Sequence, residues 1–273
     1  SRLYRTHAIW PAPGWLLPAP RRWQASLSPR SRSQASRAAC LLSGYRRAGH
    51  WKSKMTELLP LLLQGAWVTV QITFFGSLLA IVAALIGALG RLSPIKPLRW
   101  LAIVYIEVFR GSSLLVQLFW LYFVLPMPPF NIAMSAFNVA VIGLGLNIGS
   151  YGAEVLRGAI RSVHEGQYEA CQALNMTAGQ RLRRVILPQA LLAAIPPGTN
   201  LLIELLKNTS LVSLITLSDL AFRARQLDQA TLMTLEIFGL ALVMYFVLAQ
   251  IINFSMRTLE RRLARGRMRG GMS

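Results

Sequence analysis

The chain has 273 residues, 54% hydrophobic and 14% charged, with a formal net charge of +19. Soluble globular domains are about a quarter charged, and here the apolar residues come in long blocks, which excludes an ordinary soluble domain and indicates lipid as the solvent. The two cysteines, Cys40 and Cys171, lie far apart without CxxC spacing and support neither a disulfide framework nor a metal site.

The first 54 residues differ from the rest of the chain. They contain eleven Lys or Arg and no Asp or Glu, and they are rich in Ser, Pro and Trp. This composition cannot bury a core and holds no secretory signal; an organelle transit peptide is an alternative interpretation. Because an apolar run at 58–63 follows Met55 closely, we interpret Met55 as the natural start and 1–54 as a disordered basic leader from translated upstream sequence.

Five later segments are long and apolar enough for a bilayer, which needs about 20 apolar residues per helix. They predict an all-α polytopic membrane protein with five transmembrane helices. In the third segment, three closely spaced glycines, Gly143, Gly145 and Gly149, predict close helix packing. The segments are 66–90, 99–125, 133–156, 191–215 and 234–256.

The connections between these segments carry an orientation signal. Arginine and lysine gather after the first, third and fifth segments, whereas the connection at 126–131 is uncharged and that at 219–228 is mixed. The positive-inside rule then places the C-terminus in the cytoplasm and the region near Met55 outside. The basic tail at 266–273 is interpreted as a topology determinant that contacts lipid headgroups, not as a nucleic-acid site.

The inner connection at about 157–189 is long enough to hold structure. Its Ala, Gln, Glu and Leu content predicts two short helices, joined by a turn at 175–179, with Thr177 as the N-cap of the second. Three small side chains would give the first helix a face that another protein can approach closely. They are Ala170, Cys171 and Ala173.

This inner connection resembles the EAA loop of ABC importer permeases. Glu169-Ala170-Cys171 stands where that family has Glu-Ala-Ala, and Asn175 stands at a family Gly. Asn tolerates the left-handed backbone that Gly would supply. The family's Ile-x-Leu-Pro is Val-Ile-Leu-Pro at 185–188 here.

Further segments resemble permeases for polar amino acids. Residues 105–117 are similar to the family's YIE-x-FRGTPLLVQ signature, with Ser112-Ser113 at the Thr-Pro, and 207–213 are similar to its KNTSL segment. With 152–160, the resemblance covers essentially 56–265, and within the family it looks closest to permeases assigned to ectoine and hydroxyectoine uptake.

The resemblance implies a type I importer in the bacterial inner membrane. Two permease subunits, identical or paralogous, would form the pathway, an extracytoplasmic binding protein would deliver the solute, and an ABC ATPase would dock on the inner loop. The chain itself would be a transport subunit without a cofactor, not an enzyme; it has no G-x-x-x-x-G-K-[S/T] run, so ATP would be bound by the partner. The loop residues implied in ATPase coupling are Glu169, Ala170, Cys171, Asn175, Leu187 and Pro188.

Charged residues also occur within the predicted spans, where each costs about 2.5–3.5 kcal/mol on insertion scales. Glu204 and Lys207 share a helix face at i,i+3. Two interpretations stand side by side: they line the solute pathway with Asn208 and Thr209, or they form a buried structural pair. The run Pro-Pro-Gly at 196–198 predicts a kinked or unwound helix just before them.

A second polar group lies in the second predicted span. Glu107 and Arg110 form another i,i+3 pair, beside a Gly-Ser-Ser interruption at 111–113. With Gln117 they are predicted to have a gating or structural role and not to contact the solute. Glu154 and Arg157, at the inner end of the third span, are interpreted as interfacial anchors that lead into the loop.

Two other classes of protein fit the sequence less well. A stand-alone secondary transporter or channel would suit the intramembrane charges, but five spans without an evident internal repeat do not. A membrane enzyme would need a nucleophile–base arrangement, a metal cluster or paired carboxylates. The sequence shows none of these, and His164 has no second ligand at metal-binding spacing.

Overall fold

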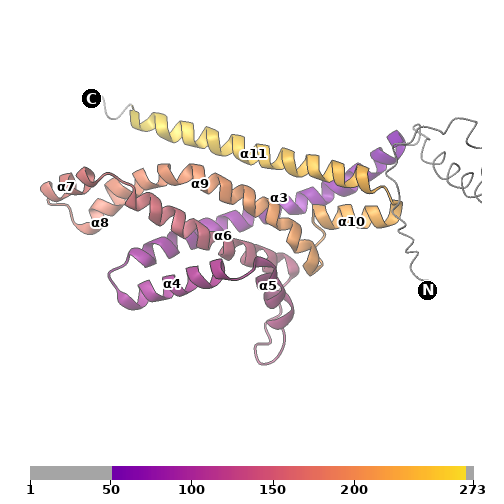
Figure 1. The fold of residues 1–273 in the computed structure, drawn as a ribbon, viewed down its shortest axis with the longest axis horizontal. Coiled ribbons are helices and arrows are strands. Elements are labelled where there is room, and N and C mark those ends of the chain that lie inside the picture. The colour runs from indigo at the N-terminus through magenta and orange to yellow at the C-terminus, as the bar shows by residue number, and fades with distance from the viewer. Residues whose placement is uncertain (1–50, 269–273) are drawn as a thin grey trace, which may run out of the picture. The chain divides into compact units, whose positions relative to one another are not determined.

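The computed structural model describes residues 51–268, and these fold into helices without a strand. The predicted leader falls largely outside the described residues, as does the end of the tail at 269–273, and the unit that carries the membrane segments begins at Glu57. Figure 1 shows the helices. They are α3 (Trp51–Leu92), α4 (Lys96–Gly111), α5 (Leu114–Phe119), the π-helix η1 (Trp120–Val124), α6 (Ala136–Arg161), α7 (Glu165–Ala173), α8 (Ala178–Arg181), the π-helix η2 (Leu182–Ile186), α9 (Leu187–Asn208), the 3-10 helix η3 (Thr209–Ile215), α10 (Leu220–Thr231) and α11 (Thr234–Met268).

Five membrane-spanning elements match the five predicted segments. In the described part of the chain, four helices are long and apolar enough to cross a bilayer by themselves. The fifth is the pair α4 and α5–η1, which counts as a span only when taken together. The all-α prediction is therefore confirmed. The four continuous spans are Leu58–Leu92, Ala136–Arg161, Ala178–Ile215 and Thr234–Leu263.

The second predicted span is broken where the sequence shows its Gly-Ser-Ser interruption. Its two halves meet at an angle of 105°, and Figure 1 shows α5 turning away from the line of α4. Ser112 and Ser113 adopt extended backbone, and the Ser112 hydroxyl donates to the carbonyl of Val108 at 2.5 Å. Serine hydroxyls compete with the helix ladder in this way, so the chain leaves the helix here.

The three glycines of α6 allow neighbouring helices to approach closely, as predicted. A Cβ at Gly149 would lie 2.7 Å from the Cβ of Ala83 on α3, and one at Gly145 would lie 2.8 Å from the Leu79 side chain. A Cβ at Gly143 would meet Leu118 of α5. Van der Waals packing of this kind drives helix association in lipid, where apolar burial gives little advantage.

The predicted unwinding of the fourth span at 196–198 is not observed. Helix α9 continues through Pro196 and Pro197 to Asn208. Prolines inside membrane helices are tolerated when neighbouring helices and hydroxyl side chains support the weakened turn. Here α6 and α11 pack along α9, and Thr199 donates its hydroxyl to the carbonyl of Ile195 at 2.9 Å.

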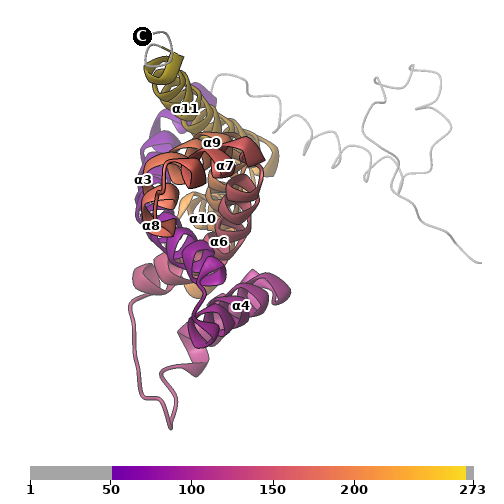
Figure 2. The ribbon, with the colours of Figure 1, turned by 90° about the vertical axis from the view of Figure 1, so that its left-hand side faces the viewer.

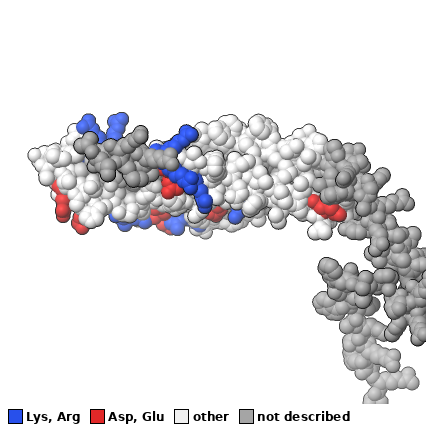
Figure 3. Space-filling view, turned by 90° about the horizontal axis from the view of Figure 1, so that it is seen from above, with Lys and Arg blue, Asp and Glu red and all other residues white. Residues whose placement is uncertain are grey.

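Buried apolar side chains form separate clusters along the bundle. The cluster near the inner loop joins Ala88, Ile106, Ile160 and Ile186, and so ties the start of the long fourth helix to α3, α4 and α6. In Figure 3 the Lys and Arg side chains lie mainly over the half that carries α7 and α8, and the other half is largely uncharged apart from an acidic group near its far end. This distribution agrees with the prediction that the loop end faces the cytoplasm.

Candidate functional site: the inner loop and the polar groups at membrane depth

The first helix of the inner loop, α7, has a defined start and end. His164 caps it, because its Nδ1 accepts from the Gly166 N–H at 3.1 Å. At the other end Asn175 adopts the left-handed conformation, with φ of 53°. Its N–H bonds to the carbonyl of Gln172 and the next N–H, of Met176, reaches back to Cys171. This is a Schellman motif with Asn in place of Gly, as the sequence predicted.

The second helix begins at the predicted cap. Thr177 and Gln180 form a reciprocal capping box, with hydrogen bonds of 3.3 and 3.1 Å. The helix does not end after one or two turns as expected, because α8 continues through η2 into α9. Leu187 and Pro188 lie partly buried in this continuous helix, directly after η2.

The faces of α7 differ in one respect from the prediction. Glu169, Ala170 and Ala173 are exposed, but Cys171 is only 3% exposed and turns toward the body of the protein. Successive helical residues are 100° apart, so Cys171 cannot share the outward face of Glu169 and Ala173. The surface that a partner can reach is therefore formed by Glu169, Ala170 and Ala173.

Tyr168 anchors this loop and was missed by the sequence argument. Its hydroxyl donates to the carbonyl of Ile160, near the end of α6, at 3.1 Å. The guanidinium of Arg181 lies 5.5 Å from the centre of its ring. An aromatic residue with a polar tip inside a helix of Ala, Gln and Glu was the available signal. Tyr168 thus holds α7 against both α6 and α8.

Helix α9 carries an exposed polar stripe at membrane depth. Glu204 and Lys207 are exposed, and Asn200, which the sequence argument missed, shares their face at i,i+4,i+7 spacing. Within the described residues no ion pair joins Glu204 to Lys207, so the two side chains do not pair with each other in this chain. Asn208 is partly buried. Thr209 does not join the stripe, because it is fully buried and donates to the Leu206 carbonyl.

A charge cluster joins α3, α4 and α6. Glu154 accepts from Arg91 at 2.7 Å and from Arg157 at 2.6 and 2.9 Å. Arg91 also lies 3.7 Å from the Glu107 carboxylate. The predicted pair of Glu107 with Arg110 is therefore replaced, since Arg91 of the preceding helix reaches this carboxylate.

Arg110 has a different neighbour from the one predicted. Its guanidinium lies 5.3 Å from the centre of the Tyr151 ring on α6, a cation–π geometry. The Tyr151 hydroxyl donates to the Arg110 carbonyl at 3.4 Å. Sequence spacing indicates which residues of one helix share a face, but it does not show which neighbouring helix supplies a better partner.

Gln117 closes the break between α4 and α5. Its amide donates to the Phe109 carbonyl at 3.0 Å and to the Ser112 hydroxyl at 2.6 Å. Asn147 of α6, which is 5% exposed, donates to the same carbonyl at 3.0 Å and to the Gln117 side-chain oxygen at 3.1 Å. Carbonyls at a helix end lack intrahelical partners. The amides of Gln117 and Asn147 both donate to the Phe109 carbonyl, which the break leaves without an intrahelical partner.

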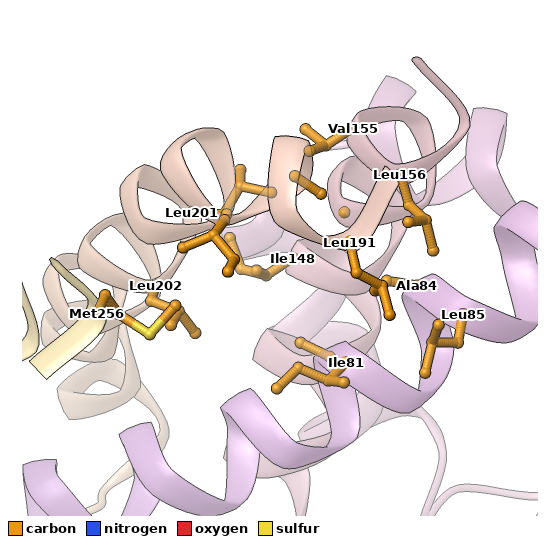
Figure 4. Close-up of a pocket in the computed structure, with 15 residues that line it drawn as sticks. Ile81, Ala84, Leu85, Ile148, Val155, Leu156, Leu191, Leu201, Leu202 and Met256 are labelled. Atoms are coloured by element: carbon orange, nitrogen blue, oxygen red, sulfur yellow. The ribbon is translucent and has the colours of Figure 1, made fainter. Parts of the chain in front are cut away.

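The described helices also enclose an apolar pocket of about 250 Å³ between α3, α6, α9 and α11. Figure 4 shows Ile81 and Leu85 of α3 on one side of it, with Leu191 and Leu202 of α9 and Met256 of α11 around it. Almost no polar atom lines the pocket. A charged or zwitterionic solute would lose its hydrogen bonds there, so this pocket is not its binding site.

Asp219 lies in the connection before α10, outside the spans. Its carboxylate caps α10 by accepting from the N–H groups of Phe222 at 2.9 Å and Ala221 at 3.3 Å. Burial of the side chain raises the pKa of Asp219 to about 6, although these hydrogen bonds act in the opposite direction. No sequence pattern singled this residue out, because its burial depends on the packing of α10 and α11.

The chain matches one family of known proteins. Residues 76–265 match the family model for the binding-protein-dependent transport system inner membrane component. The chain belongs to this family. It is therefore a multi-pass membrane permease component.

Individual relatives agree with the family. The chain is 45% identical over 208 residues to the probable amino-acid ABC transporter permease protein y4tF of Sinorhizobium fredii, covering 75% of this chain and 87% of the relative. It is 38% identical over 221 residues to the L-cystine transport system permease protein TcyB of Bacillus subtilis, covering 79% and 92%. The crystal structure of an amino acid ABC transporter with histidines superimposes with a TM-score of 0.71 at 34% identity, covering 77% of this chain and 97% of the other.

Proposed function

We propose that this permease component forms the transmembrane pathway of an ABC importer for a polar amino acid. A separate ATPase binds and hydrolyses ATP and a binding protein delivers the solute. The observation that carries this proposal is the inner loop. It presents Glu169, Ala170 and Ala173 outward, on a helix closed by a Schellman turn at Asn175, within a chain of this family.

In this arrangement the inner loop and the C-terminus face the cytoplasm, and α10 faces outward. Support comes from the arginines near the loop end and the uncharged connection at 126–131. The outward face of α7 is the contact for the ATPase. Leu187 and Pro188 fix the start of α9 behind it, and Cys171 shapes the loop from inside.

The solute pathway lies along the polar stripe of α9. Asn200, Glu204 and Lys207 are exposed on a membrane-spanning helix, and charges facing lipid are costly. This face is therefore covered by water or by a second permease subunit, either a copy of this chain or a paralogue. A carboxylate and an ammonium on one face also complement a zwitterion, which carries both charges.

The names of the relatives support a polar amino acid as the solute. Among them are permease proteins named for L-cystine and for glutamine. Ectoine and hydroxyectoine are also zwitterions and remain competing substrates within the proposal. Uptake measurements with this chain, its ATPase, its partner permease and its binding protein in proteoliposomes would separate them by competition.

That experiment also tests the class of transporter. Uptake that requires both internal ATP and the binding protein supports the importer. If the chain alone accumulates solute down an ion gradient, it is a secondary transporter and the proposal is wrong.

The coupling contact is tested by Glu169→Ala. The variant is expected to lose roughly tenfold of the solute-stimulated ATPase activity, the effect of one lost contact of about 1.4 kcal/mol. Gln167→Ala is the control, because Gln167 is also exposed but lies about 200° around α7 from Glu169 and so is off the Glu169–Ala173 face. Equal coupling in both variants would remove Glu169 from the ATPase contact.

A further inference from the structure

Three polar residues of α6 lie on one face of the helix and meet α4, α5 or the end of α3. Asn147, Tyr151 and Glu154 follow i,i+4,i+7 spacing, so they form one stripe along the helix. We call these three residues the α6 polar stripe. Such residues are rare within membrane helices and usually have a partner that accounts for them.

Each member of the stripe holds the neighbouring span at a different level. Asn147 bonds to the Phe109 carbonyl at 3.0 Å and to Gln117 at 3.1 Å, where α4 gives way to α5. Tyr151 contacts Arg110 through its ring and its hydroxyl. Glu154 binds Arg91 at 2.7 Å, and Arg91 reaches Glu107 of α4.

A further hydrogen bond has its donor on α4 and its acceptor on α6. Tyr105 of α4 donates its hydroxyl to the Leu146 carbonyl of α6 at 2.8 Å. Together these contacts fix the register of α4 on α6. A slide of one residue along the helix axis would break several of these polar contacts at once, and the buried Asn147 would lose both of its partners.

The same helix leads directly into the inner loop. Tyr168 of α7 donates to the Ile160 carbonyl, about one turn beyond Arg157. A single continuous helix, Ala136–Arg161, therefore connects the loop at its C-terminal end with the break between α4 and α5, which it contacts near its middle at Asn147.

We infer that the α6 polar stripe is the mechanical link between the inner loop and the broken second span. Asn147, Tyr151 and Glu154 are positioning residues: they make α4 and the start of α5 move with α6 when the ATPase moves the loop. This inference rests on the proposed function, because it assumes that the loop receives motion from an ATPase.

The functional test uses the complete complex in proteoliposomes and measures solute imported per ATP hydrolysed. Asn147→Leu is expected to lower this ratio roughly tenfold. Asn138→Leu makes the same substitution at an exposed position on α6 and should leave the ratio unchanged. In a double-mutant cycle with Gln117→Leu, the loss in the double variant should be smaller than the sum of the two single losses, because each single variant already removes the hydrogen bond between Asn147 and Gln117.

The structural test follows α4 and α6 directly. Spin labels are placed on cysteines at Val104 of α4 and Gly158 of α6, both exposed, with Cys40 and Cys171 replaced by serine. Their distance should stay the same with and without ATP when the stripe is intact, and it should broaden in Glu154→Gln. This measurement decides the matter even if Asn147→Leu does not fold.

The outcomes separate the two proposals. If the wild-type complex shows no ATP-driven uptake, the proposed function fails. If the wild type is coupled but the label distance changes on ATP binding, or folded Asn147→Leu keeps the wild-type ratio, only the mechanical link is wrong.

Discussion

At the scale of single residues, backbone and burial decide what each position tolerates. Asn175 has φ of 53°, which L-residues other than Asn, Asp and Gly adopt at a cost of roughly 1–2 kcal/mol. Asp219 is fully buried, yet its carboxylate caps α10. The backbone conformation of Asn175 and the burial of Asp219 therefore each lead to a prediction.

Asn175→Gly should keep both coupling and thermal stability, because glycine adopts the left-handed conformation freely. Asn175→Val should lower the unfolding free energy by about 1–2 kcal/mol and loosen the end of α7. Solute-stimulated ATPase activity and the melting temperature in detergent measure the two effects. A valine variant as stable as the glycine variant would show that the turn does not require this conformation.

Asp219 should make stability depend on pH. Its folded pKa of about 6 exceeds its ordinary 3.8, so the folded state holds this proton more tightly than the unfolded chain. Stability from this group is present below pH 4 and is lost as pH rises through about 6, by about 3 kcal/mol in total. Asp219→Asn keeps a capping side chain and should remove this slope. Melting temperatures of both proteins at pH 5 and 8 test it; parallel curves would contradict the burial effect.

At the scale of elements, the break between α4 and α5 is the most informative. Ser113 has φ of −69° and makes no capping hydrogen bond through its side chain to the described residues. The preceding residue, Ser112, is extended, with ψ of 153°. Both conformations suit a proline at position 113. The Ser-Ser of this chain therefore reaches the geometry that a Thr-Pro would impose.

Ser113→Pro should leave uptake unchanged and raise the unfolding free energy by about 0.4–1 kcal/mol, because it restricts the unfolded chain. Phe119→Pro is the control within α5 and should cost about 3 kcal/mol or more, because this position lies beyond the first turn, where proline removes a helical hydrogen bond. Thermal unfolding of the two variants beside the wild type checks this. Destabilisation by Ser113→Pro would mean that the break is not fixed at this residue.

At the scale of the whole molecule, charge distribution and apolar surface define how the described unit sits in a membrane. Its large exposed side chains include Trp67, Ile86, Leu242 and Phe254 on α3 and α11. Lipid or another subunit must cover them, since monomeric soluble proteins rarely expose such patches. The loop end carries arginine, and α10 lies in the connection assigned to the outer side.

The orientation predicts which positions a membrane-impermeant thiol reagent can reach. In a chain whose own cysteines are replaced by serine, Gln229→Cys on α10 should be labelled in intact cells. Gly179→Cys, which is exposed and has nothing within 4 Å of its added Cβ, should be labelled only in inverted vesicles. The reverse pattern would invert the topology and contradict the positive-inside assignment.

The sequence by itself determined the class, the five spans, the Thr177 cap and the Asn175 turn of the inner loop, and the break at the Gly-Ser-Ser run. Each depends on local chemistry: hydrocarbon thickness sets span length, and cap residues bond within a few positions along the chain. Asn175 and Thr177 were predicted for this reason. The family followed from short motifs that the matched region 76–265 confirms.

Only the tertiary structure decided the partners of the polar groups. Glu107 pairs with Arg91 and not Arg110, Cys171 faces inward, and α9 continues through its prolines. Asn147 and Tyr168 gain their roles from carbonyls on other helices. Spacing reports which residues share a face, but the distance between side chains on different helices depends on how those helices pack, and that is a property of the folded chain as a whole.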